Sequence, residues 1–195
     1  MLFGLTGIAV FAFWALARPS FEMTTSMQEW PAVLWFSATL LVLAVAILVF
    51  GRMVGGRSLV RLANLAAGGV ALSSAANILE DGFRIGAAFF AFILGTFTMD
   101  LALIALTVVM VRTLVGRQRL LALVPAGTVA GILLFVPAGG PTMLVTWLSA
   151  TAAAAVLPRW RASTAGGGSA THPARRMTDP IRCVAASRRS SRSTS

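Results

Sequence analysis

The segment PAVLWFSATLLVLAVAILVF, residues 31–50, decides the fold class because it carries no charged side chain. A bilayer hydrocarbon core about 30 Å thick is crossed by roughly 20 helical residues. Apolar residues surround this segment on every side, whereas the strands of a membrane β-barrel alternate apolar and polar residues. The segment therefore predicts a membrane-spanning α-helix.

The composition of the whole chain agrees with a membrane protein. Of its 195 residues, 57% are hydrophobic and 11% are charged, and the mean hydropathy is +0.85. Soluble domains are roughly 45–50% apolar and about 25% charged. A water-soluble globule with this balance would expose large apolar patches, so we predict an integral membrane protein.

Five further apolar segments predict an all-α, polytopic transmembrane helix bundle of six spans within residues 1–158. The spans are residues 2–17, 31–50, 62–79, 85–111, 120–136 and 141–157. The first segment has an alternative interpretation, because Ala15-Leu16-Ala17 fits the small-x-small cleavage pattern of a signal peptide. No arginine or lysine precedes that segment, which favours a retained span.

Every basic residue is arginine, and arginine-rich connections alternate with arginine-poor ones along the chain. Three arginines follow the second span, three follow the fourth, and eight lie beyond Pro158. Because cytoplasmic loops of membrane proteins are enriched in Lys and Arg, we expect both termini in the cytoplasm. The absence of Lys and Tyr indicates a GC-rich genome, so we expect the inner membrane of a bacterial cell.

Residues 159–195 are expected to form a disordered cytoplasmic tail, because this Arg/Ser-rich segment has too little apolar surface to fold. Anionic headgroups of membrane lipids attract such segments and are the expected partner. The alternative is an extension that has no partner. A nucleic-acid partner is not expected, because no aromatic side chains are interleaved with the arginines beyond Arg161.

The scarcity of reactive side chains excludes several chemistries. The only cysteine, Cys183, and the only histidine, His172, both lie in the tail. An internal disulfide, a thiolate zinc site, bis-histidine haem ligation and an HExxH zinc site are therefore excluded. We expect no metal, no cofactor and no catalytic residues, and an intramembrane lipid enzyme is disfavoured because paired catalytic residues are missing.

Asp100 lies near the middle of the fourth span, where an ionised carboxylate costs roughly 2.5–3.5 kcal/mol. At 100° per residue it shares one helical stripe with Thr96 and Thr107. Lipid offers no hydrogen-bond partner, so we expect Asp100 to face the bundle with a polar group of another helix in reach. Two interpretations follow: a proton, cation or substrate site, or a protonated side chain that only holds helices together.

Small residues predict where helices approach one another closely. Ala87, Ala91 and Gly95 form a stripe roughly opposite Asp100. The fourth helix is therefore expected to have neighbours on two sides and to be central in the bundle. Further close contacts are predicted at Gly68-Gly69, Gly127 and Gly131.

A second polar group lies at the outer end of the third span. Spacings of three and four residues place Ser73, Asn77 and Glu80 on one face, next to Asp81. Hard oxygen ligands in this arrangement are able to bind a divalent cation. The alternative is a solvated, acidic helix end in which Asn77 bonds to a neighbouring helix.

Two functions follow from these residues. The first is a small transporter or permeation protein whose polar interior is built around Asp100; its candidate substrate- or ion-binding residues are Asp100, Thr96, Thr107, Asn77, Glu80 and Asp81. The second is a non-catalytic membrane module: an accessory subunit, an assembly partner or a lipid-binding scaffold. A hydrated cavity that reaches Asp100 favours the first function, and a dry, tightly packed Asp100 favours the second.

Overall fold

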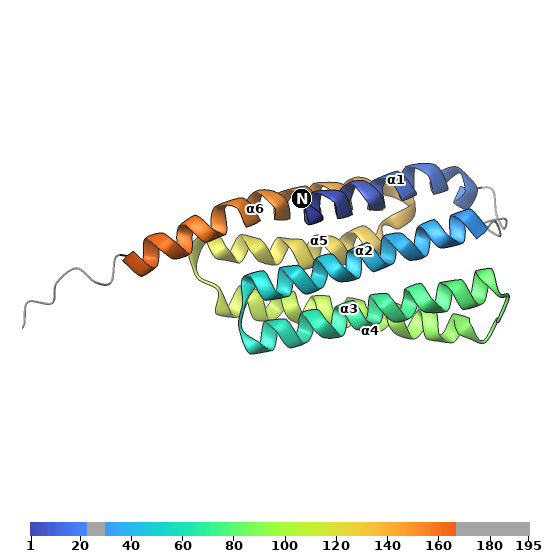
Figure 1. Cartoon of the computed structure of the whole chain (residues 1–195), viewed down its shortest axis with the longest axis horizontal. Helices are drawn as coiled ribbons and strands as arrows, with labels where there is room; N and C mark the ends of the chain where they lie inside the picture. The colour runs from blue at the N-terminus through green and yellow to red at the C-terminus, as the bar shows by residue number, and fades with distance from the viewer. Residues whose placement is uncertain (23–29, 167–195) are drawn as a thin grey trace, which may run out of the picture. The chain divides into compact units, whose positions relative to one another are not determined.

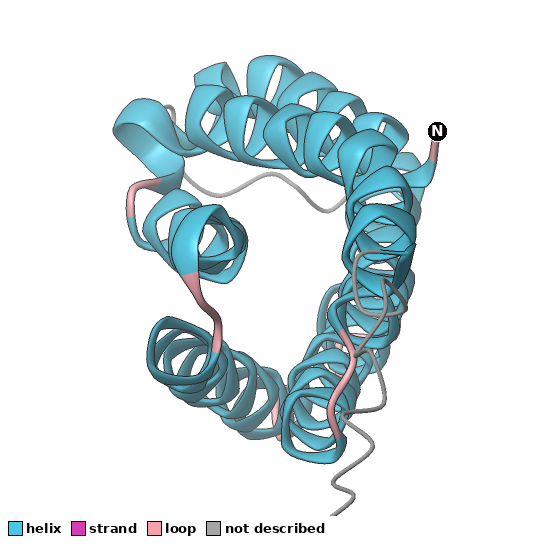
Figure 2. Cartoon of the chain, turned by 90° about the vertical axis from the view of Figure 1, so that its left-hand side faces the viewer, coloured by secondary structure: helices cyan, strands magenta, loops and turns pink. Residues whose placement is uncertain are grey.

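The described part of the chain is almost entirely helical (Figures 1 and 2). This computed structural model describes residues 1–22 and 30–166. The α-helices are α1 (Leu2–Glu22), α2 (Trp30–Val54), α3 (Arg57–Asn77), α4 (Ala88–Thr113), α5 (Leu123–Leu133) and α6 (Gly140–Gly166). Short helical turns are η1 (Ile78–Gly82), η2 (Gly116–Ala122) and η3 (Phe135–Gly139). The described residues contain no strand, so the all-α prediction is confirmed.

Within the described residues, three helices are long and apolar enough to cross a membrane: Trp30–Val54, Arg57–Gly82 and Ala88–Thr113. The segment Leu2–Leu16 is a shorter apolar helix. Large apolar side chains cover the outward face of α4, where Phe90 is 76% exposed and Leu101 is 65% exposed. An apolar face of this kind fits a lipid environment better than water.

The fifth predicted span, residues 120–136, is not one continuous α-helix. It consists of the 3₁₀ turn η2, the 11-residue helix α5 and the π turn η3. Pro125 lies in the first turn of α5, the part of a helix where a missing N–H is tolerated. Because η2 and η3 flank α5, the regular α-helix in this segment is limited to 11 residues.

The chain divides into two units, Met1–Leu157 and Pro158–Ser195. Helix α6 continues to Gly166, so it includes the first residues of the predicted tail, 159–166. The rest of the predicted tail, residues 167–195, lies outside the described residues.

Helix α3 packs between α2 and α4 through small residues. A Cβ atom built on Gly69 would lie 2.6 Å from the carbonyl oxygen of Gly95 and 2.7 Å from the backbone nitrogen of Met99. On the other flank, a Cβ on Gly51 of α2 would overlap Ala63. Only residues with little or no side chain permit such close approach of helix backbones.

The expectation that α4 is the central helix is therefore corrected. Helix α4 does contact neighbours on two sides, α3 and α5, but α3 lies between two long helices. The predicted contact at Gly69 is confirmed, whereas a Cβ on the adjacent Gly68 would meet no atom within 4 Å. The stripe that contains Gly95 was expected on the opposite side of α4 from the stripe that contains Thr96. In the structure the two stripes are less separate, since Gly95 and Thr96 both contact Ser73.

Helix α6 packs against α1 and α5. A Cβ on Gly7 of α1 would lie 3.2 Å from the Leu144 carbonyl oxygen. The predicted close contacts at Gly127 and Gly131 are confirmed, and their neighbours in α6 are Thr146 and Met143. Aromatic rings join these helices to α2, because Phe3 lies 5.7 Å from Trp147 and 6.3 Å from Phe50 between ring centroids.

We predict that Gly69→Ala lowers the free energy of unfolding by about 1–3 kcal/mol, because the new methyl group forces the α3 and α4 backbones apart. Gly68→Ala is the matched control, since it adds the same methyl group in open space. It should leave the free energy unchanged or raise it by up to about 1 kcal/mol, since Ala favours helix over Gly. Reversible unfolding of the purified protein in mixed micelles, followed by circular dichroism, measures both. Equal effects of the two substitutions would contradict the packing described.

Candidate functional site

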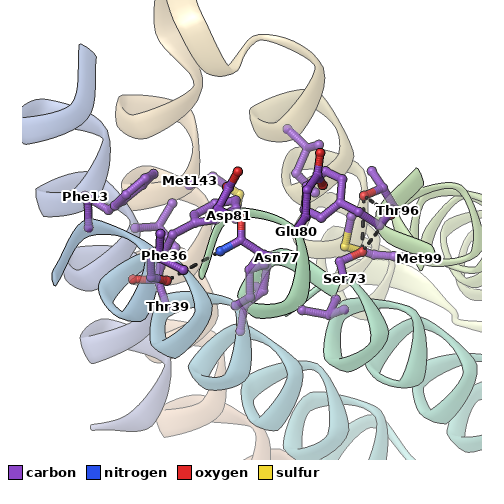
Figure 3. Close-up of a pocket in the computed structure, with 18 of the residues that line it drawn as sticks. Phe13, Phe36, Thr39, Ser73, Asn77, Glu80, Asp81, Thr96, Met99 and Met143 are labelled. Carbon is purple, nitrogen blue, oxygen red and sulfur yellow. Dashed lines mark hydrogen bonds between the residues drawn. The ribbon is translucent and has the colours of Figure 1, made fainter. Parts of the chain in front are cut away.

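A cavity of about 460 Å³ lies inside the unit Met1–Leu157. Its lining comes from all six α-helices and from η1, and Figure 3 shows ten of the lining side chains by name. Most of the lining is apolar. Aromatic rings form one continuous part of the wall, since Phe36 lies 4.9 Å from Phe13 and 6.4 Å from Phe92 between centroids.

Six polar side chains line this cavity. Ser73 and Asn77 of α3, Glu80 and Asp81 of η1, and Thr96 of α4 all line it, together with Thr39 of α2. The residues of α3 and η1 share this position because helical spacings of three and four place them on one face. Asp81 is exposed and Glu80 is half-buried, so the cavity reaches the surface of the described structure at η1.

Hydrogen bonds join α3 to α2 next to the cavity. Asn77 Nδ2 donates to Ser37 Oγ at 3.0 Å and to the Val33 carbonyl oxygen at 3.4 Å. Ser74 Oγ donates to the Ser37 carbonyl oxygen at 2.9 Å, and Ser37 Oγ donates in return to that of Ser74 at 3.3 Å. Ser37, Ser74 and Asn77 are all buried. The interpretation of Asn77 as a bond between helices is confirmed.

A second set of bonds joins α3 to α4. Ser73 Oγ donates to the Phe92 carbonyl oxygen at 3.1 Å and lies 3.2 Å from Thr96 Oγ1. Thr96 Oγ1 donates to the same carbonyl at 3.0 Å. Together with the α2 contacts, these bonds place the polar face of α3 at the boundary of three helices.

Asp100 does not line the cavity, although its neighbours Thr96 and Met99 do. Its Oδ1 atom is buried and has no hydrogen-bond partner among the described residues. The expectation of a polar group from another helix is therefore wrong for this oxygen. The polar side chains Ser73 and Asn77 of α3 bond elsewhere, to the Phe92 carbonyl oxygen of α4 and to Ser37 and Val33 of α2.

Thr107 also lies away from the cavity and donates to the carbonyl oxygen of Leu103 in its own helix at 2.8 Å. The structure thus brings together four of the six predicted residues, Asn77, Glu80, Asp81 and Thr96, and leaves out Asp100 and Thr107. Whether the four bind a ligand stays a prediction. Within the described ranges no three Asp, Glu, His or Cys side chains gather to hold a metal ion, so the divalent-cation hypothesis gains no support.

Sequence reasoning missed Ser37 and Thr39, which lie beside the cavity on α2. The available signal was the presence of two hydroxyl groups within the otherwise apolar segment 31–50. It also missed the aromatic wall, because the three rings come from separate helices and no local spacing relates them.

Comparison with protein-family models, curated proteins and solved structures finds no match for this chain. No known activity of a relative therefore bears on the cavity. Its chemistry follows from its own side chains.

We predict opposite effects for two substitutions that each replace a polar side chain with leucine. Asp100→Leu should raise the free energy of unfolding by about 1–3 kcal/mol, because a buried oxygen without a partner is removed. Asn77→Leu should lower it by about 1 kcal/mol, because two bonds between helices of about 0.6 kcal/mol each are lost. The mixed-micelle unfolding measurement described above tests both. A loss of stability in Asp100→Leu would show that its carboxyl group has a stabilising partner.

Proposed function

We propose that this chain is a small transporter or permeation protein of a bacterial inner membrane, with no enzymatic activity. The observation that carries the proposal is the cavity of about 460 Å³. Ligand cavities of roughly 300–1,000 Å³ are mostly apolar and hold a few polar groups that orient the ligand. The cavity fits this description, because six polar side chains stand in a lining that is otherwise aromatic and aliphatic.

The polar interior of the proposed transporter is centred on Asn77 and Thr96, where the sequence had indicated Asp100. Glu80 and Asp81 lie at the end where the cavity meets the surface. A small molecule in the cavity would meet both the charged oxygens of these two residues and the aromatic rings of the wall. This combination suits an amphipathic ligand.

The proposal includes six membrane-spanning segments with both termini in the cytoplasm. The charge at the two ends of the helices supports it. Arg52 and Arg57 flank the connection between α2 and α3, and Arg112 and Arg117 flank the connection after α4. Figure 1 draws these two connections at the same end of the helices and η1, with its two acidic residues, at the opposite end. Cytoplasmic loops favour the arginine-rich end.

A second function, the non-catalytic membrane module, is favoured by one observation. The cavity stops short of Asp100, and the buried oxygen of that residue has no partner among the described residues. Asp100 in this interpretation contributes to assembly and not to a permeation path. Under either function, the Arg-rich segment 159–195 is proposed to bind anionic lipid headgroups.

The topology predicts the location of reporter domains fused after three glycines. Fusions after Gly55, Gly82 and Gly116 should lie in the cytoplasm, outside the cytoplasm and in the cytoplasm, because arginine-rich connections stay inside. Paired alkaline phosphatase and green fluorescent protein fusions report the two sides. A cytoplasmic signal after Gly82 would refute the six-span orientation.

Thiol labelling tests whether small molecules enter the cavity. In a Cys183→Ser background, Thr39→Cys should react with N-ethylmaleimide about tenfold faster than Thr128→Cys, because a thiol reacts only where reagent reaches it. Thr128 is the matched control: both threonines are buried, both donate to the carbonyl oxygen four residues earlier, and only Thr39 lines the cavity. Equal rates would contradict an accessible cavity and favour the membrane module.

A further inference from the structure

We propose that the cavity selects an organic cation, a molecule with an apolar body and a positively charged group. This inference rests on the proposed function, because it names the class of ligand that the same cavity accepts. Four features of the cavity carry it: the use of every donor hydrogen in its polar wall, the free oxygen of Asn77, the two carboxylates at η1 and the aromatic rings.

The hydroxyl groups of the cavity wall have no hydrogen left to donate to a ligand. Thr39 Oγ1 donates to the Trp35 carbonyl oxygen at 2.9 Å. Ser73 Oγ and Thr96 Oγ1 both donate to the Phe92 carbonyl oxygen, at 3.1 Å and 3.0 Å. Because a hydroxyl group has one hydrogen and two lone pairs, these three side chains offer a ligand only acceptor positions.

The amide of Asn77 likewise offers a ligand only an acceptor. Its Nδ2 atom donates to Ser37 Oγ and to the Val33 carbonyl oxygen, which uses both N–H bonds. Its Oδ1 atom forms no hydrogen bond with any described residue, and the side chain is 5% exposed and lines the cavity. An amide carbonyl without a donor in such a place favours a ligand that carries N–H or a positive charge.

The charged groups of the lining are both negative. Glu80 and Asp81 line the cavity, and no arginine of the described residues does. The arginine nearest to these two residues in sequence is Arg84. It is exposed and follows η1 in a left-handed backbone conformation with φ of 58°. An anion in this cavity would meet two carboxylates with no opposing charge, whereas a cation is attracted to them.

The aromatic wall accommodates a cation and its apolar body together. Phe13, Phe36 and Phe92 come from three helices and contact one another through Phe36. The face of an aromatic ring is negative, so it attracts an organic cation within about 6 Å of its centroid. The same rings repel the negative end of an anionic ligand. The aromatic wall and the two carboxylates therefore both favour a cation over an anion.

Two ions of the same shape and opposite charge test the inference: tetraphenylphosphonium and tetraphenylborate. Each is added separately to the full chain, purified in a neutral sugar-headgroup detergent, and the thermal unfolding midpoint is followed with ligand concentration. A ligand that binds only the native state raises this midpoint and yields an affinity. Protein-free detergent gives the background for each ion.

We expect tetraphenylphosphonium to bind at least about tenfold more tightly than tetraphenylborate, because both carboxylates favour the cation. Replacing the two carboxylates together, Glu80→Gln with Asp81→Asn, should weaken phosphonium binding about tenfold and leave borate binding unchanged or improved. Asp100→Asn is the matched control, since it removes a carboxylate that does not line the cavity. It should change neither affinity by more than about twofold.

The remaining outcomes separate the two proposals. If tetraphenylborate binds as tightly as tetraphenylphosphonium, cation selection is refuted, and the proposed binding cavity stands. If neither ion raises the unfolding midpoint, the proposed function fails together with the inference. If Asp100→Asn weakens phosphonium binding as much as the double substitution does, the assignment to Glu80 and Asp81 is refuted. The unfolding midpoint without ligand shows that each variant is folded.

Discussion

The contact between the backbones of α3 and α4 at Gly69 and Gly95 is the constraint on which the cavity depends. A Cβ on either glycine would lie 2.6 Å from a carbonyl oxygen of the other, so neither position has room for a side chain. This close approach fixes the register of the two helices. It places Ser73, one turn further along α3, within 3.1 Å of the Phe92 carbonyl oxygen. In a membrane, where helices gain little from apolar burial against one another, packing of this kind is a main source of association.

The position of the cavity follows from the different residues on the sides of α3. Small residues and hydroxyl groups hold α3 close to α2 and α4. Large rings from α1, α2 and α4 contact one another beyond this layer and keep the neighbouring helices further apart. The volume between the two arrangements is lined by both, so its wall changes from polar at α3 to aromatic at Phe36. The same side-chain contacts therefore hold the helices together and determine the shape of the cavity.

The hydrogen bonds that join the helices also set the chemistry of the cavity. Each hydroxyl or amide donor in the wall is used by a backbone carbonyl or by Ser37, because unpaired donors are costly away from water. What remains for a ligand is a set of oxygen acceptors. Asp100 differs from these paired side chains, because no described element presents a donor to its Oδ1 atom. Its burial thus comes from the packing of α4, and the polar site lies about one helical turn away at Thr96.

The sequence by itself determined the features that depend on local composition and periodicity. Long runs of apolar residues require helices, glycines at Gly69, Gly127 and Gly131 predicted close contacts, and the spacing of Ser73, Asn77 and Glu80 placed them on one face. Only the tertiary structure decided which faces meet. It supplied Ser37 as the partner of Asn77, joined Phe13, Phe36 and Phe92 into one wall, and left Asp100 outside the cavity. The physical reason is that helical periodicity acts over a few residues, whereas these contacts join residues up to 56 positions apart and depend on how whole helices pack.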